Sequence, residues 1–295
     1  MKKITSILIA TVLCVYVATQ VMGGSSMSMK SSHRPSKPLK TGQTTSYATG
    51  DDGDLELGII RSYTVYTTGQ YSGTTEISVD GVAHNMSNAK VRDNRTGIDW
   101  MREVVTSDIG PGGAGKFFWE QYTLTGKTDI SFVNSTGKIH SAGGDFNTDA
   151  LCAGRRFTIS GSSGNDGTYT VSAVDANDIT TVEGVADEGA GATIDLATSG
   201  GLILDMLAAV NAAGVGGHTD WRIPNAFELY KLVDLGEYNP CINTTVFPST
   251  PSSYHWTAST RPGGTTIAFG VNFGSGNVNG SNKQTVLYYV RLCRG

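Results

Sequence analysis

The stretch Asp220-Trp221-Arg222-Ile223-Pro224-Asn225, continued by Ala226-Phe227-Glu228-Leu229, predicts where a helix begins. Asn225 is a residue type that caps helix N-termini. Glu228 stands three positions later, where its carboxylate can return to the cap backbone and complete a capping box. The expected apolar side of this helix comprises Phe227, Leu229, Leu232 and Val233.

A longer helix is predicted just upstream of this motif. Its apolar residues recur at helical spacing and fall on one face, namely Leu202, Met206, Leu207, Val210 and Ala213. Gly214 can end this helix, because glycine accepts the left-handed conformation of a C-terminal cap.

Further upstream, the pattern changes to β-strands. Residues 63–66 form a β-type run, and residues 91–100 predict a strand, a polar turn and a second strand. From about Thr128, short strands separated by turn clusters follow one another, at residues 130–133, 156–159, 168–171, 179–182 and 192–194. This spacing predicts a small β-barrel or sandwich over residues 128–197, inserted into a domain formed by residues 41–127 and 198–295.

The C-terminal segment has the composition of a binding surface. Between Pro262 and Val290 the only charged residue is Lys283, and Gly, Asn and Ser crowd the loops at residues 274–277 and 279–282. These residues hydrogen-bond adaptably, as in antibody contact loops, and bring no strong acid or base. The alternative is a solvent-exposed turn region with no binding role.

Strand alternation separates a frame from a contact surface. In residues 267–273 the large apolar side chains alternate with small or polar ones, so Ile267, Phe269, Val271 and Phe273 are expected to face the core. The predicted frame is Trp256, Phe269, Val271, Phe273, Val290 and Arg291. The predicted ligand-binding residues are Thr265, Thr266, Gly270, Asn272, Gly274, Ser275, Asn279, Gly280, Ser281, Asn282, Thr285 and Leu287.

The N-terminus predicts export. Met1-Lys2-Lys3 and the apolar run at residues 4–17 are typical of a secretory signal peptide, assigned to residues 1–23, although retention as an anchor stays open. Residues 24–40, rich in Ser and Pro with scattered charge, predict a flexible tether. Without the signal, 20 basic residues stand against 26 acidic ones, a formal charge of −6, so nucleic acid is not an expected partner.

Catalytic and cofactor motifs fail on inspection. Residues 110–116 have phosphate-loop spacing, but Phe117 replaces the hydroxyl residue that holds magnesium. Asp145, Asn147 and Asp149 resemble the start of a calcium loop, yet Ala150 and Arg156 replace its glycine and its bidentate glutamate. The five histidines lack metal-ligand spacing, although His218 and His255 could meet in the fold. No cofactor, metal or enzymatic activity is expected.

Four ordered motifs carry a family resemblance: residues 41–54, residues 93–100, residues 220–229 and Tyr289-Val290-Arg291. Together they resemble the C-terminal domain family of the Legionella collagen-like adhesin. The resemblance implies a C-type lectin-like α+β domain, interrupted here by a small all-β module. Asp99 departs from the family, which usually has an apolar residue there. Through Gly161-Ser162 and residues 165–171, the insert is similar, more weakly, to modules of phage-associated proteins.

The end of the chain adds a second resemblance. Residues 268–279, with Tyr289-Val290-Arg291-Leu292-Cys293-Arg294, are similar to the variable regions of proteins diversified by retroelements. This implies an exported display protein that binds a protein or glycan ligand on a cell or phage surface, with the oligomeric state left open. The alternatives are a glycan-binding adhesin of fixed specificity and an enzyme of the formylglycine-generating type. Oxidising conditions outside the cytoplasm further predict a Cys241–Cys293 disulfide, with Cys152 left unpaired.

Overall fold

The computed structural model describes residues 38–79, 82–105 and 115–295. The predicted signal peptide, residues 24–37 of the predicted tether and residues 110–114 of the phosphate-loop-like stretch lie outside the described residues. At the end of the predicted tether, Leu39 forms a parallel bridge with Ile59, and the Lys40 amide donates to the Ile59 carbonyl at 3.0 Å.

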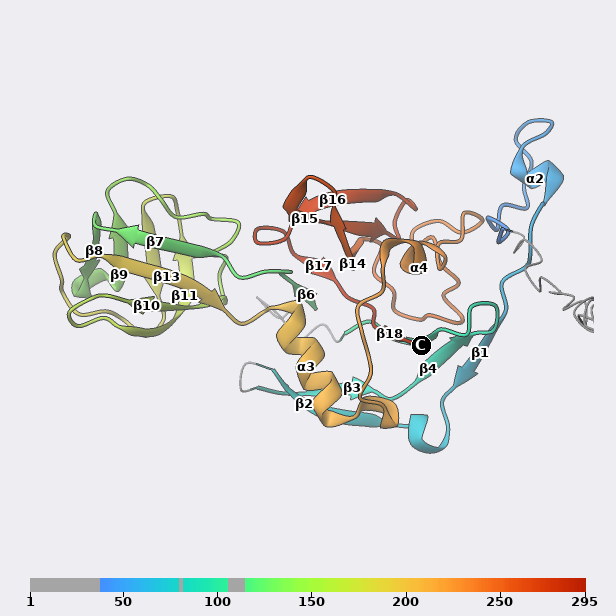
Figure 1. Cartoon of the computed structure of the whole chain (residues 1–295), viewed down its shortest axis with the longest axis horizontal. Coiled ribbons are helices and arrows are strands. Elements are labelled where there is room, and N and C mark those ends of the chain that lie inside the picture. Colours follow the sequence, from blue (N-terminus) through green and yellow to red (C-terminus); the bar gives the residue numbers. More distant parts are fainter. Residues whose placement is uncertain (1–37, 80–81, 106–114) are drawn as a thin grey trace, which may run out of the picture. The chain divides into compact units, whose positions relative to one another are not determined.

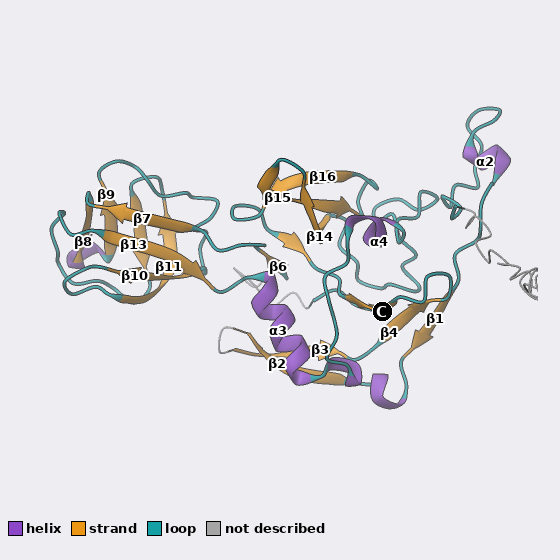
Figure 2. Cartoon of the chain, viewed as in Figure 1, coloured by secondary structure: helices purple, strands orange, loops and turns teal. Residues whose placement is uncertain are grey.

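The described chain is a mixed α+β structure built mostly of strands, with few helices (Figure 2). The α-helices are α2 (Asp52–Leu55), α3 (Ile203–Ala213) and α4 (Ala226–Tyr230). Short 3₁₀ turns are η1 (Gly69–Tyr71), η3 (Asn134–Thr136) and η4 (Val215–Gly217). The predicted α+β class is therefore confirmed at this level.

Three sheets form the part of the chain outside the insert. The first has the order β1 (Tyr63–Tyr66), β4 (Lys90–Asp93), β5 (Asp99–Met101) and β18 (Cys293–Arg294). The second has the order β16 (Val278–Asn282), β15 (Gly264–Asn272), β14 (Tyr254–Arg261), β17 (Tyr288–Tyr289) and β6 (Lys116–Phe117). The third is the hairpin of β2 (Thr74–Val79) and β3 (Val82–Ser87).

The predicted insert forms a seven-stranded antiparallel sheet with its own core (Figure 1). Its order is β7 (Thr123–Lys127), β13 (Ile194–Ser199), β10 (Arg156–Ser160), β11 (Gly167–Val174), β12 (Asp178–Thr181), β9 (Lys138–Ser141) and β8 (Ile130–Val133). Four predicted runs fall on β8, β10, β11 and β12, whereas the run at residues 192–194 reaches β13 only at Ile194, and β7 and β9 were not predicted. The sheet begins at Thr123 and ends at Ser199, so it extends beyond the predicted range of 128–197 at both ends.

Both predicted helices are present, but each predicted apolar face includes one wrongly assigned residue. Helix α4 has the full capping box: the Asn225 side chain accepts from the Glu228 amide, and the Glu228 carboxylate accepts from the Asn225 amide. Helix α3 ends at Gly214 in the left-handed conformation. However, Leu202 is the N-cap of α3 and only half-buried, and Phe227 is 84% exposed, because α4 is too short to bury its whole apolar stripe.

Two hydrophobic cores meet at the five-stranded sheet. In the first core, α3 packs against β2, these elements contribute Met206 and Ile77, and the core also includes Trp256 and Ala268. The second core lies between α4 and the four-stranded sheet and includes Val271. Since Ala268 and Val271 both belong to β15, this strand is covered on both faces over part of its length.

Candidate binding surface

The sheet formed by β14, β15 and β16 presents two chemically different faces. Residues that pair directly across antiparallel strands point to the same side. Asn272 pairs with Tyr254, and Gly270 pairs with Trp256 and Asn279. We call this side, which carries Tyr254, Trp256, Gly270, Asn272, Asn279 and Ser281, the tyrosine face. The opposite side, which carries Phe269, Val271 and Val278, is called the helix face because α4 lies against it.

An aromatic stack forms the centre of the tyrosine face. The rings of Tyr254 and Tyr288 stack with centroids 4.9 Å apart and an interplanar angle of 15°, and Tyr288 also contacts Trp256 at 4.5 Å. Trp256 is fully buried beneath them, and its indole N–H donates to the Phe117 carbonyl at 2.7 Å. Such a stack combines a rigid base with half-exposed tyrosine rings, which supply large contact area at low entropic cost.

The stack is joined directly to predicted contact residues. The Tyr288 hydroxyl lies 2.5 Å from the Ser281 hydroxyl. Partial burial raises the pKa of Tyr288, an effect that the Ser281 hydrogen bond partly offsets, so its hydroxyl stays neutral and can donate or accept. Gly270 lies under the same ring, where a Cβ would be 2.8 Å from Tyr288 Cε2. Tyr254 and Tyr288 are not among the contact residues predicted from the sequence. Tyrosines flanking a segment rich in Ser, Asn and Gly are the signal that could have identified them.

The predicted contact residues differ in accessibility. Four are exposed: Thr265, Thr266, Ser275 and Asn279. Seven are half-buried: Asn272, Gly274, Gly280, Ser281, Asn282, Thr285 and Leu287. Gly270 is buried, which corrects its predicted place on an open surface, because the Tyr288 ring covers it. Asn282 and Gly280 pair with Ile267 and Phe269, so they lie on the helix face instead of beside the tyrosines.

The predicted frame residues are buried, with one exception. Trp256, Val271, Phe273, Val290 and Arg291 have no exposed surface. Phe269 is only half-buried, which corrects its predicted place in the core. It lines a surface pocket of about 380 Å³ on the helix face, together with Ala226, Phe227, Tyr230, Ser259 and Val278. The short helix α4 leaves this part of the sheet uncovered, so the alternation of side chains was correct but the coverage was not.

Arg291 fixes the base of the surface through backbone groups. Its guanidinium donates to the Met101 and Arg102 carbonyls at 2.7 and 2.6 Å and to the Thr250 hydroxyl at 2.6 Å. Full burial lowers the pKa of Arg291 to about 9, so the group is charged at neutral pH. A charge buried with these partners orders the loops around it, which suits a frame residue more than a ligand contact.

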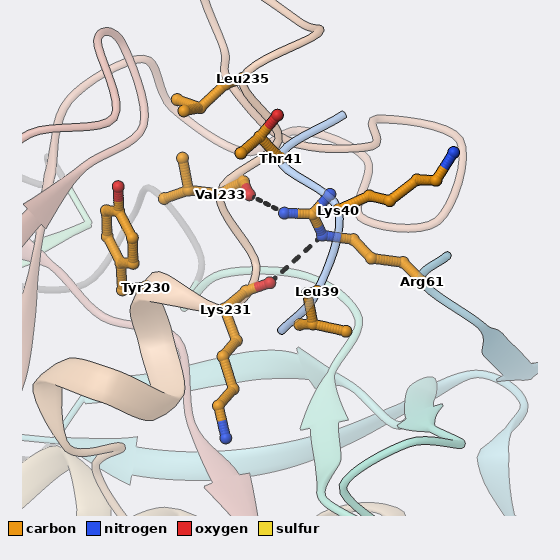
Figure 3. Close-up of a pocket in the computed structure, with 8 residues that line it drawn as sticks. All are labelled: Leu39, Lys40, Thr41, Arg61, Tyr230, Lys231, Val233 and Leu235. Atoms are coloured by element: carbon orange, nitrogen blue, oxygen red, sulfur yellow. Dashed lines mark hydrogen bonds between the residues drawn. The ribbon is translucent and has the colours of Figure 1, made fainter. Parts of the chain in front are cut away.

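A second pocket, of about 190 Å³, lies where two segments of the chain are held together (Figure 3). Leu39, Lys40 and Thr41 line it on one side, and the segment after α4 lines it on the other. The Arg61 guanidinium donates to the carbonyls of Lys231, at 3.3 Å, and Val233, as Figure 3 shows. These donors are used up in holding the two segments together, so the pocket offers little for recognition.

The family motif around Asp220 serves the structure. Arg222 makes a bidentate pair with the capping-box residue Glu228, at 2.8 and 2.9 Å, and also donates to the Gly295 carbonyl at 2.8 Å. The Trp221 indole is buried and donates to the Val215 carbonyl at 2.9 Å. Asp220 accepts from Arg294 at 2.7 Å. The motif therefore combines ion pairs with an anchoring aromatic residue, and the exposed Asp220 takes part in one of these pairs.

Asp99 has charged partners. It is buried and accepts from Lys90 at 2.8 Å and from Arg294 at 2.9 Å. The Lys90 ammonium also lies over the rings of Tyr66 and Tyr71, at 5.0 and 4.6 Å from their centres. The carboxylate therefore links β4 to the C-terminal strand β18 by charge.

The predicted Cys241–Cys293 disulfide is wrong for this structure. Both cysteines are buried in the same core, and both are free thiols, as is Cys152. Burial raises the pKa of the Cys293 thiol to about 12, which suppresses the thiolate that disulfide exchange requires. The two residues were correctly placed in one region, but they pack as small apolar groups.

The remaining candidate motifs form no site. His218 contacts Tyr71 and Trp221, whereas His255 packs against Phe273 and Tyr289, so these histidines have separate surroundings. The Asn147 side chain accepts from the Asp149 and Ala150 amides, which makes an ordinary turn of the calcium-loop-like stretch. Among the described residues, no group of three metal-ligating side chains comes together, and no helix has the length and apolarity to span a membrane.

Comparison with known proteins identifies the family. Residues 89–294 match the family model described as the Lcl C-terminal domain, which is more than half of the chain, so the protein belongs to this family. The matched range contains the whole β14–β16 sheet and runs across the insert, while residues 41–88 lie outside it. No curated protein and no solved structure matches the chain.

Proposed function

We propose that this member of the Lcl C-terminal domain family is an exported ligand-binding protein, and that the tyrosine face contacts the ligand. One observation carries the proposal. The Tyr254–Tyr288 stack rests on the buried Trp256 and is bordered by Asn272, Asn279 and Ser281. Half-exposed tyrosines beside small hydrogen-bonding residues, on a rigid base, are the features of antibody contact surfaces. The chemistry suits a protein or glycan ligand.

We further propose that the domain is C-type lectin-like and that its contact residues are diversified. Support comes from the separation of roles: Trp256, Val290 and Arg291 are buried, whereas Ser275 and Asn279 are exposed. Exposed residues of this kind can change with little loss of stability. A reverse transcriptase gene and an imperfect repeat of the last coding segment in the neighbouring DNA would support diversification. A neighbourhood without either would leave a binding surface of constant sequence.

The second candidate is a glycan-binding adhesin of fixed specificity. The observation that favours it is the Tyr254–Tyr288 pair, because aromatic rings can stack on the apolar face of a sugar. The two candidates differ in what variation does. Under diversification, changes at Asn272, Asn279 and Ser281 create new specificities, whereas in a fixed adhesin they only weaken binding to one glycan.

A catalytic role has less support. The formylglycine-generating type of enzyme would require a reactive cysteine pair in a cleft, whereas Cys241 and Cys293 are buried in the core. The tyrosine face contains no carboxylate or histidine among the residues that define it. We therefore propose binding without turnover, in an extracytoplasmic setting that the N-terminal sequence predicts.

A pair of display libraries tests the proposal. The first randomises Asn272, Ser275, Asn279 and Ser281, and the matched control randomises exposed residues of the insert, Thr158, Ser160 and Thr168. Both libraries are expected to fold, as judged by thermal unfolding of random members. Only the first should yield members with new specificities when sorted against panels of proteins and glycans. Equal yields from both libraries, or widespread unfolding in the first, would contradict a binding role for the tyrosine face.

A further inference from the structure

The turn that follows β16 is held from outside its own sheet. This turn, residues 283–287, carries the predicted contact residues Thr285 and Leu287 and leads directly to Tyr288 of the aromatic stack. Its position therefore affects where the Tyr288 ring lies. Within the sheet it is held by Lys283 N–H to Thr266 O at 2.9 Å, Val286 N–H to Asn282 O at 3.2 Å, and Gln284 N–H to Asn282 Oδ1 at 2.9 Å.

The segment that leads into the insert binds one end of this turn through Trp119 and Glu120. The Lys283 carbonyl accepts from both the Trp119 and Glu120 amides, at 2.8 and 3.0 Å. The Lys283 ammonium makes an ion pair with the Glu120 carboxylate at 2.8 Å, with the lysine side chain 7% exposed. The only charged residue between Pro262 and Val290 is thus used in this attachment and is not available to a ligand.

The insert itself contributes a second contact. Arg155 precedes β10 and is 1% exposed. Its guanidinium donates to the Ala150 carbonyl at 2.5 Å, inside the insert, and to the Gln284 carbonyl at 3.3 Å, in the turn. The same group lies 3.6 Å from the centre of the Phe118 ring. One side chain therefore connects the insert, its entry segment and the binding-surface turn.

Arg155 carries a buried charge, which a contact that only separates two segments would not need. Its Nε and its second terminal nitrogen are buried and have no hydrogen-bond partner, and no carboxylate pairs with it among the described residues. Burying a cation in this way costs free energy that an apolar side chain would not. In return, the rigid guanidinium gives a directed hydrogen bond to a chosen backbone carbonyl.

We propose that Arg155 is a positioning residue for ligand binding, through which the inserted module holds the 283–287 turn and the adjoining Tyr288 in place. The proposal rests on the proposed function of the tyrosine face. It makes the insert a determinant of affinity, because a preordered turn loses less conformational entropy on binding. Removing the contact should leave the strands intact and loosen the turn.

Hydrogen exchange of the full mature chain tests this without any ligand. In Arg155→Met, the amides of Lys283, Gln284 and Val286 should exchange about tenfold faster, as expected when one stabilising hydrogen bond is lost. The control Arg156→Met changes the neighbouring exposed arginine in the same way and should leave these rates unchanged. A binder selected on the parent protein should dissociate faster from Arg155→Met only.

A second variant keeps the test decisive if Arg155→Met unfolds the insert. Glu120→Gln removes the ion pair with Lys283 without touching the core of the module, and it should also speed exchange in the turn. Unchanged exchange at residues 283–286 in both variants would overturn the proposal. If exchange in the turn is faster but no library yields a binder, Arg155 does hold the turn in place and the proposed binding function is rejected.

Discussion

The rings of Tyr254 and Tyr288 stack 4.9 Å apart, which joins strand β14 to β17 on the tyrosine face. The two residues are 34 positions apart in the chain and meet because His255 and Tyr289 pair in parallel strands. Their contact places one tyrosine from each end of the Gly- and Asn-rich segment at the centre of the surface.

The Ser281–Tyr288 contact should couple the two residues energetically. Their hydroxyls are 2.5 Å apart, so removing either one breaks the same hydrogen bond. In a double-mutant cycle of Ser281→Ala and Tyr288→Phe, we expect a coupling of about 1 kcal/mol in the free energy of unfolding. Urea unfolding of the parent, the two single variants and the double variant measures it. Strictly additive effects would mean that the hydroxyls do not interact in solution.

Gly270→Ala should destabilise the fold in spite of being a small change. The new Cβ would lie 2.8 Å from Tyr288 Cε2 and 3.3 Å from the His255 carbonyl, so the aromatic stack must shift. We expect a loss of about 1–3 kcal/mol, as for other overpacked sites. Gly189→Ala is the control, because nothing lies within 4 Å of its Cβ position. If both variants unfold at the same denaturant concentration, the close approach of Tyr288 to Gly270 is not present.

His255 should make the protein less stable as the pH falls. Burial lowers the pKa of His255 to about 3, whereas in the unfolded chain it is near 6.5. Because the unfolded state binds the proton first, stability is present above pH 6.5 and is lost progressively as the pH falls toward 3. At pH 5 the loss should be about 2 kcal/mol relative to pH 7.

The His255 prediction has a direct control. His255→Gln should remove most of this slope between pH 6.5 and pH 5, whereas His218→Gln should remove less, since His218 is only half-buried. Denaturant unfolding at several pH values gives the comparison. An unchanged slope in His255→Gln would show that another group controls the acid sensitivity.

Cys152, Cys241 and Cys293 should all be free thiols. Denaturing the purified protein in the presence of an alkylating reagent should modify all three, as found by peptide mapping without reductant. In the native state, Cys293 should react slowly, because burial both hides it and raises the pKa of its thiol to about 12. A linked Cys241–Cys293 peptide would restore the disulfide that the structure argues against.

The inserted sheet should be removable as a unit. The two ends of the sheet lie side by side, because the Thr198 amide donates to the Tyr122 carbonyl at 2.9 Å, so a short Gly/Ser linker can join Tyr122 to Gly200 after removal of residues 123–199. The remaining domain should unfold in one cooperative transition, since its cores contain no residue of the deleted sheet. A broad, non-cooperative transition would indicate one continuous core.

Features set by neighbouring residues could be predicted from the sequence. The capping box of Asn225 and Glu228, the end of α3 at Gly214 and the turn between β4 and β5 each depend on contacts within a few residues. The short strands of the insert likewise follow from alternation and turn chemistry, which act locally. The family motifs followed the same logic, because they mark these local structures.

Only the tertiary structure decided which faces are covered and what meets across the sheet. Alternation in residues 267–273 separates two faces, but it cannot tell that Tyr288 covers Gly270 or that α4 is too short to cover Phe269 and Phe227. The thiol state of Cys241 and Cys293 and the meeting of Tyr254 with Tyr288 also depend on how distant segments pack. The sequence by itself therefore determined the elements and their ends. Long-range packing, which no local pattern encodes, assembled the candidate binding surface from them.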